Sequence, residues 1–147
     1  MILLVDDNKD DAALILRSLK PQLSAGGIRH VTDGDAAMEF LQQRDGQPLQ
    51  LILLDLHMPT LPGFDVLKRL RSNEHTRRTP VVIVSGSDLS GDVARSYDLG
   101  ANSFINKNDQ PKQFAETVRQ VTDYWLTLNY LCPLHAVVTA TPPPGAH

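Results

Sequence analysis

The chain has 147 residues, 41% of them hydrophobic, with a formal charge of −3 and a pI near 5.9. This length allows one domain with a sizeable core, and the acidic balance predicts no direct nucleic-acid partner, because binding to phosphate backbones needs a basic surface. The sequence has no long apolar stretch and no basic leader, so we expect a cytoplasmic protein without a membrane segment. The single cysteine, Cys132, cannot form an intramolecular disulfide.

The first part of the chain alternates between buried strands and amphipathic helices. Residues 1–5 are all apolar, which is typical of a strand buried on both faces. Asn8 or Asp7 can cap the helix that follows, because their side chains can accept hydrogen bonds from its first turn. A second strand is predicted at 28–31 and a second helix around 36–41.

The middle of the chain continues the same alternation. The run 51–56 gives the clearest buried strand, and a turn-rich stretch leads from it into a third helix over 64–70. Another buried strand at 81–84 precedes a fourth helix that begins near Ser90. Residues 103–106 predict a weaker fifth strand.

The last predicted helix is the longest and carries a single apolar stripe, in which apolar residues recur at intervals of three and four. That stripe consists of Phe114, Val118, Val121, Trp125 and Leu128. Beyond it, the sequence contains three consecutive prolines and no helical period. We therefore expect one folded domain over 1–131 and a flexible, proline-rich C-terminal extension over 132–147.

Five strands that alternate with five helices predict an α/β fold with a doubly wound, five-stranded parallel sheet. Parallel strands need crossover connections, and the helices that provide them cover both faces of the sheet, which makes a three-layer sandwich. In open sheets of this kind, ligands bind beyond the carboxyl ends of the strands. Functional residues are therefore expected immediately after the strands.

Five polar side chains follow the predicted strands and are expected to meet at that edge. They are Asp6, Asp7, Asp55, Ser85 and Lys107. Each alone has an ordinary structural role, as a helix cap, a turn residue or a solvated charge, but three carboxylates in one crevice repel each other. A Mg²⁺ ion would relieve that repulsion, while Lys107 and Ser85 would suit the oxygens of a phosphoryl group. The set predicts phosphoryl transfer to a carboxylate.

The sequence strings around these residues resemble those of response-regulator receiver domains, which have a flavodoxin-like fold. ILLVDDN contains the two adjacent acids, LILLDLHMPTLPGFDVLKRLR contains the string DLxMPxxxGxD, and the later serine and lysine follow in the right order. The resemblance implies that Asp55 is the phosphoacceptor. It also implies a Mg²⁺ site formed by Asp7, Asp55 and the backbone carbonyl of His57, with Asp6 acting through water.

The same resemblance implies roles for residues that surround the acceptor. Ser85 would bond to the phosphoryl group, and Lys107 would pair with it. Ser85 and Phe104 would form the conformational switch. His57 and Ser87 occupy the positions that, in the family, tune the access of hydrolytic water.

The sequence departs from the family pattern directly after the lysine. Receivers usually have a proline there with a cis peptide bond, whereas this chain has Asn108. A cis bond before a residue other than proline costs about 2.5–4 kcal/mol, so the departure affects the expected signalling geometry. We still expect a phosphoacceptor switch, which catalyses only its own phosphorylation and dephosphorylation, and not an enzyme that acts on other substrates.

The C-terminal part resembles the small receivers that partner phytochrome-type histidine kinases in bacteria. The resemblance lies in SYDLGANSFINK and in VTDYWLTLNYLCP, which places a Tyr-Trp pair in the last helix. We expect a sensor histidine kinase as partner, and apolar residues off the buried stripe predict a homodimer through the fourth helix, the fifth strand and the final helix. The candidate interface residues are Tyr97, Tyr124, Trp125, Leu128 and Leu131. A structural role, in which the sheet buries the aromatic side chains, stays open for Tyr124 and Trp125.

Three other functions share parts of this pattern. A phosphatase of the haloacid-dehalogenase type also uses an aspartate after a parallel strand, but it needs a second aspartate where this chain has His57. A flavodoxin-like FMN protein needs a phosphate-binding loop after the first strand, where Asp6 and Asp7 would repel the phosphate. A pseudo-receiver that is never phosphorylated stays open, although the complete set of acids, serine and lysine disfavours it.

Overall fold

The secondary structure alternates regularly between strands and helices. The computed structural model describes residues 1–23, 27–44, 48–87 and 90–133. In chain order the elements are β1 (Ile2–Val5), α1 (Lys9–Leu19), a 3₁₀ turn (Lys20–Gln22), β2 (Ile28–Val31), α2 (Gly34–Gln43), β3 (Leu51–Leu54), α3 (Gly63–Ser72), β4 (Val81–Ser85), α4 (Ser90–Asp98), β5 (Ser103–Asn106), α5 (Pro111–Asp123) and a π-helical turn (Tyr124–Leu128). Most of the predicted extension over 132–147 lies outside the described residues.

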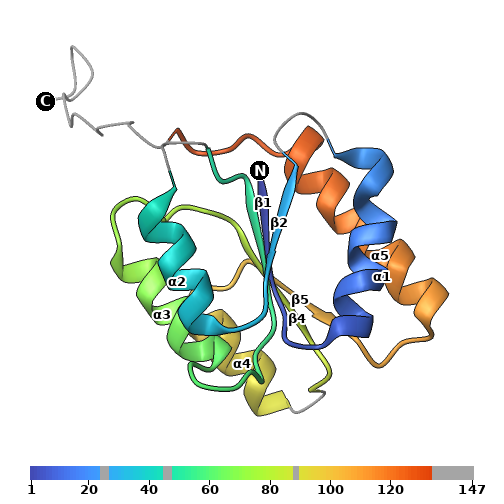
Figure 1. Cartoon of the computed structure of the whole chain (residues 1–147), viewed down its shortest axis with the longest axis horizontal. Coiled ribbons are helices and arrows are strands. Elements are labelled where there is room, and N and C mark those ends of the chain that lie inside the picture. The colour runs from blue at the N-terminus through green and yellow to red at the C-terminus, as the bar shows by residue number, and fades with distance from the viewer. Residues whose placement is uncertain (24–26, 45–47, 88–89, 134–147) are drawn as a thin grey trace, which may run out of the picture.

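The five strands form one parallel sheet in the order β2-β1-β3-β4-β5. Helices α2, α3 and α4 cover one face of the sheet, and α1 and α5 lie side by side on the other (Figure 1). This arrangement confirms the predicted doubly wound, three-layer fold. Because all strands run in the same direction, their carboxyl ends lie at one edge, which is the lower edge in Figure 1.

The sheet is buried on both faces, which explains the uninterrupted apolar runs. In β1, Leu3 and Val5 belong to the core under α2 and α3, while Ile2 and Leu4 belong to the core under α1 and α5. Alternate residues of a strand point to opposite faces, so a strand covered on both sides needs apolar residues at every position. Burial of these side chains drives the packing of the three layers.

One glycine places the start of α3 directly against the strand end that carries Asp55. A Cβ on Gly63 would lie 2.1 Å from the carbonyl oxygen of Asp55 and 2.7 Å from the Cα of Leu56, so no larger residue fits without displacing backbone. The Gly63 N–H also donates to the Leu56 carbonyl at 2.9 Å. The glycine of the DLxMPxxxGxD string therefore fixes the segment around Asp55.

The end of the last helix differs from its prediction. The α-helix ends at Asp123, and the Asn129 N–H donates to the Tyr124 carbonyl at 2.8 Å across a π-helical turn. Such a turn contains more residues than an α-helical turn, which shifts the following side chains around the helix axis. Phe114 and Val118 are buried as predicted, but Leu128 is 69% exposed and does not continue the buried stripe.

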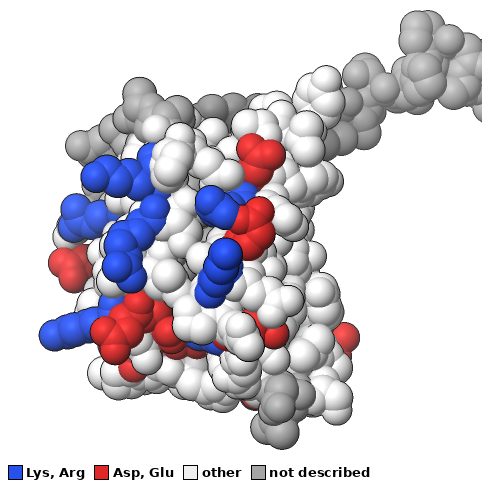
Figure 2. Space-filling model, turned by 90° about the vertical axis from the view of Figure 1, so that its right-hand side faces the viewer, with Lys and Arg blue, Asp and Glu red and all other residues white. Residues whose placement is uncertain are grey.

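Charge is unevenly distributed on the face formed by α1 and α5. Figure 2 shows Lys and Arg side chains along this face with some acids among them, and a group of Asp and Glu side chains toward its lower end, where α1 begins. That end is also the carboxyl edge of the sheet. Within the described parts of the chain, no helix is long and apolar enough to span a membrane.

Candidate functional site

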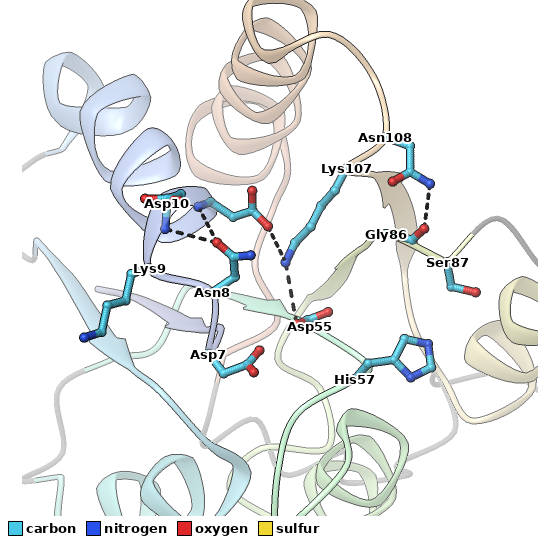
Figure 3. Close-up of a pocket in the computed structure, with 11 residues that line it drawn as sticks. Asp7, Asn8, Lys9, Asp10, Asp55, His57, Gly86, Ser87, Lys107 and Asn108 are labelled. Carbon is cyan, nitrogen blue, oxygen red and sulfur yellow. Dashed lines mark hydrogen bonds and ion pairs between the residues drawn. The ribbon is translucent and has the colours of Figure 1, made fainter.

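Three carboxylates meet at the carboxyl edge of the sheet. Asp6 and Asp7 directly follow β1, and Asp55 directly follows β3, the neighbouring strand. One carboxylate oxygen from each of the three lies within 4.8 Å of the others. Asp6 and Asp55 are buried, whereas Asp7 is exposed at the mouth of the site. The predicted convergence of these acids is confirmed, and Figure 3 shows Asp7 and Asp55 on the same side of the pocket.

The side chain of Lys107 reaches this cluster from the loop after β5. Its Nζ lies 2.7 Å from Oδ2 of Asp6 and 3.5 Å from Oδ2 of Asp55. It also lies 3.3 Å from Oδ2 of Asp11, an acid in the first turn of α1 that was not predicted to belong to the site. The Lys107 N–H donates to the Ser85 carbonyl at 2.9 Å, which holds the base of this loop against β4.

The two carboxylate oxygens of Asp6 are already engaged by protein groups. Oδ1 accepts a hydrogen bond from the Asn8 N–H at 2.9 Å, and Oδ2 pairs with Lys107. Asp7 and Asp55 are therefore the acids better placed to bind a cation directly. A set of carboxylate oxygens suits a hard divalent cation such as Mg²⁺, so the cluster is consistent with divalent metal binding.

Burial and mutual repulsion make this site electrostatically costly. Burial raises the pKa of Asp55 to about 6; attraction to Lys107 lowers it, and repulsion from Asp6 raises it further. Burial likewise raises the pKa of Asp6 against the effect of its hydrogen bond to Lys107. Burial opposes the charge on Lys107, but the hydrogen bond to Asp6 and the attraction of Asp55 outweigh it, so the pKa of Lys107 is raised. Lys107 therefore stays protonated. A bound cation would stabilise the charged form of Asp55, which burial and the neighbouring acid disfavour.

The space above Asp55 is an open pocket lined by the loops at this edge of the sheet. Its lining residues are Asp7, Asn8, Lys9, Asp10, Asp11, Asp55, His57, Gly86, Ser87, Lys107 and Asn108. A carboxylate at the floor, a buried ammonium at the side and further acids at the rim are a set suited to accepting a phosphoryl group.

Similarity to known proteins identifies the family. Residues 2–119 match the sequence model of the response regulator receiver domain. The chain belongs to this family. It is 36% identical over 130 residues to the response regulator Rcp1 of Synechocystis sp., covering 86% of this chain and 88% of Rcp1. It is 34% identical over 132 residues to a probable methanogenesis regulatory protein, FilR2, of Methanothrix harundinacea, covering 88% of this chain and 85% of FilR2.

Solved structures show the same relationship. The phosphorylated cyanobacterial phytochrome response regulator RcpA has 35% identity and a TM-score of 0.81, covering 90% of this chain and 97% of RcpA. The Mn²⁺-bound form of Rcp1 has 36% identity and a TM-score of 0.79, covering 90% of this chain and 98% of Rcp1. The receiver fold predicted from the sequence is therefore confirmed.

Ser85 lies at the end of β4, as predicted, but it does not line the pocket. It is fully buried, and its Oγ accepts a hydrogen bond from the Ser87 N–H at 3.3 Å. Gly86 and Ser87 line the pocket instead. A bond from Ser85 to a phosphoryl group stays a prediction for this receiver, and it requires the hydroxyl to turn toward the pocket.

A hydrogen-bonded bridge across the pocket mouth was not predicted. The Ser87 hydroxyl donates to Oδ2 of Asp92 at 2.5 Å, and Nε2 of His57 lies 3.3 Å from the same oxygen. The Ser87 hydrogen bond outweighs desolvation and, with His57, lowers the pKa of Asp92. The guanidinium of Arg95, one turn along α4, lies 4.2 Å from the centre of the Phe64 ring. Two contacts thus tie α4 of this receiver to the segment that follows Asp55.

Asn108 occupies the position where receivers usually have proline. The Lys107–Asn108 peptide bond is trans, since the described part of the chain has no cis bond. The Asn108 side chain donates to the Gly86 carbonyl at 2.6 Å, and its N–H donates to Oδ1 of Asn106 at 2.8 Å. The asparagine therefore connects the loops that follow β4 and β5, a contact that proline cannot make.

The predicted switch and interface residues have different surroundings. Phe104 is half-buried and packs against the core on the α2–α3 side of the sheet. Tyr97 and Tyr124 are 49% and 47% exposed, whereas Trp125 and Leu131 are half-buried. Trp125 packs against the core on the α1–α5 side, and its ring meets that of Tyr124 edge to face. Their roles in switching or association remain predictions.

Proposed function

We propose that this receiver is a phosphorelay switch in which Asp55 accepts a phosphoryl group from a histidine kinase. The observation that carries the proposal is the position of the Asp55 carboxylate, which directly follows β3, lies beside two further acids and is 3.5 Å from the Lys107 ammonium. Asp6 is held by Asn8 and Lys107, and Asp7 has no comparably close ammonium among the described ion pairs. Asp55 is therefore the carboxylate best suited to act as the nucleophile.

The proposed transfer is a displacement at phosphorus. A carboxylate oxygen of Asp55 attacks the phosphorus of a phosphohistidine, a phosphorus–oxygen bond forms, and the phosphorus–nitrogen bond breaks with its electron pair going to the imidazole. Lys107 is positioned to bind the phosphoryl oxygens, and Ser85 is proposed to donate to them after its hydroxyl turns. Asp7, Asp55 and the His57 carbonyl would hold Mg²⁺, with Asp6 acting through water. A bound Mg²⁺ would supply positive charge that offsets repulsion between the carboxylates and the phosphoryl group.

We further propose that the kinase is of the phytochrome type and that the switch acts in the cytoplasm. Similarity to Rcp1 and RcpA over nearly the whole chain supports this partner, and RcpA is described as a phytochrome response regulator. In this proposal the receiver occupies 1–131, and the phosphorylated state is read through Ser85 and Phe104 at the face formed by α4, β5 and α5. Tyr97 in α4 and Tyr124 in the turn after α5 are exposed, and we propose that they contribute to a homodimer through this face.

Phosphotransfer from purified kinases tests the choice of partner. A phytochrome-type histidine kinase, labelled by autophosphorylation, should pass its phosphoryl group to the wild-type receiver at least about tenfold faster than an unrelated histidine kinase does. The Asp55→Asn variant should accept no label from either kinase. Equal rates from both kinases would contradict the phytochrome partner, whereas label on Asp55→Asn would contradict the acceptor.

A further inference from the structure

Lys107 has a third acidic partner that does not belong to the set expected around the phosphoacceptor. Its Nζ lies 3.3 Å from Oδ2 of Asp11, slightly closer than the 3.5 Å to Oδ2 of Asp55. The Lys107 side chain is only 9% exposed, while that of Asp11 is 34% exposed. The ammonium is therefore shared among carboxylates from the β1 edge, from α1 and from the β3 edge.

The start of α1 explains why Asp11 reaches the pocket. The Asn8 side chain caps this helix by accepting hydrogen bonds from the N–H groups of Asp10 and Asp11, each at 3.0 Å. Because α1 begins at Lys9, Asp11 lies in its first turn, where its side chain lines the pocket. Figure 3 shows Lys107 extending across the pocket from the β5 side toward Asp55.

We propose that Asp11 is a positioning residue that holds the Lys107 ammonium toward α1 and thereby restrains phosphoryl uptake at Asp55. This inference rests on the proposed function. An arriving phosphoryl group needs a hydrogen bond from the Lys107 ammonium. One of the carboxylates that the ammonium now contacts must therefore release it. Asp11 is the most exposed of the three, and water can replace the lysine there at the least cost.

The negative charge of Asp11, like its contact with Lys107, should disfavour phosphoryl binding. A phosphoryl donor is an anion, and another carboxylate beside the ammonium reduces the positive potential that attracts it. The three acids that meet as a candidate metal site do not include Asp11. Removing the charge of Asp11 should therefore favour phosphoryl binding without removing a metal ligand.

The test uses beryllofluoride, which mimics the phosphoryl group, with the full chain at saturating Mg²⁺. Asp11→Asn keeps the size of the side chain and removes its charge, and Asp98→Asn makes the same change at an exposed acid of α4 that does not line the pocket. Calorimetry should show beryllofluoride binding about three- to tenfold tighter in Asp11→Asn. Asp98→Asn should change it less than about twofold.

A second readout separates positioning from a structural effect. The NMR chemical shift of the Lys107 ammonium should change in Asp11→Asn and stay near the wild-type value in Asp98→Asn, and Asp11→Glu should restore it. Equal effects of the two asparagine variants, or an unchanged Lys107 chemical shift in Asp11→Asn, would overturn the inference while leaving the proposed function intact. Wild-type protein that binds no beryllofluoride would overturn the proposed function and the inference together.

Discussion

At the scale of single residues, the charged carboxylate of Asp55 destabilises the fold of this receiver. The carboxylate is buried beside two acids, and burial raises its pKa from 3.8 to about 6. The folded protein thus binds a proton at Asp55 more tightly than the unfolded chain does. In the absence of Mg²⁺, the contribution of Asp55 to the free energy of unfolding therefore falls as the pH rises from about 4 through 6, and this stabilisation is fully lost above that range.

Replacing Asp55 by a neutral residue should recover part of the free energy of unfolding that is lost when its carboxylate is charged. Asp55→Asn, in EDTA at pH 7.5, should unfold with a free energy about 1–2 kcal/mol higher than wild type, which allows for partial solvation of the site. The difference should disappear below pH 4, where the wild-type carboxyl is protonated. Urea unfolding at both pH values measures it, with the exposed Asp98→Asn as control. A wild-type advantage at pH 7.5 would contradict this electrostatic account.

Metal binding should depend most strongly on the exposed acid of the cluster. Asp7→Ala removes a carboxylate whose oxygen lies within 4.8 Å of those of Asp6 and Asp55. Calorimetric titration should show Mg²⁺ affinity reduced by about tenfold or more, since Mg²⁺ in proteins relies on one or two carboxylates. Asp98→Ala should bind Mg²⁺ like wild type. Unchanged affinity in Asp7→Ala would exclude this residue as a ligand.

The site residues that follow strands were predictable from the sequence, whereas the contacts that join different loops and helices were not. Asp6, Asp7, Asp55 and Lys107 could be predicted to meet because the carboxyl ends of parallel strands share one edge. The contact of Asp11 with Lys107 depends on the exact residue at which α1 begins, and that of Asp92 with His57 depends on how two loops approach each other. Neither leaves a periodic pattern in the sequence.

At the scale of elements, a charged residue fixes the junction between α3, α4 and β5. The Arg71 guanidinium donates to the carbonyls of Thr79 and Gly100 at 2.8 and 2.9 Å and to Oδ1 of Asn102 at 3.0 Å. Its burial lowers the pKa of Arg71. The Gly100 backbone has φ of +100°, and a Cβ there would lie 3.0 Å from Nε of Arg71, so this turn suits only glycine.

Removing this side chain should destabilise the fold considerably. Arg71→Ala leaves several carbonyls without a donor and should lower the free energy of unfolding by about 2–4 kcal/mol. Arg69→Ala, an exposed position in the same helix, should change it by less than about 0.5 kcal/mol. Chemical denaturation compares the two variants. Similar losses would mean that the effect belongs to the helix and not to the Arg71 hydrogen bonds.

The elements themselves were largely predictable from apolar runs and helical periods. Asn8 caps α1 as expected, and the predicted strand at 103–106 coincides with β5. The π-helical turn at the end of the last helix was not predictable, because it arises from the backbone hydrogen bond at Asn129 and not from the spacing of apolar residues. The prediction that Leu128 continues the buried stripe was therefore wrong, while its predicted role at an interface stays a prediction.

At the scale of the whole molecule, two exposed tyrosines bear on the proposed homodimer. Tyr97 and Tyr124 lie on helices of the face proposed for dimerisation, and a stable dimer buries about 1,600 Å² in total. Sedimentation at micromolar concentration should show a dimer for wild type and a shift toward monomer for Tyr124→Ser. A wild-type monomer, with and without beryllofluoride, would contradict the proposed homodimer.

The most direct test of the central claim is the intact mass of the protein after incubation with Mg²⁺ and acetyl phosphate. Wild type should gain the mass of one phosphoryl group, and the gain should disappear when EDTA replaces Mg²⁺. Asp98→Asn should gain it equally, while Asp55→Asn should gain none. The account would be contradicted if wild type stayed unmodified in Mg²⁺ or if Asp55→Asn took up the group as readily as wild type.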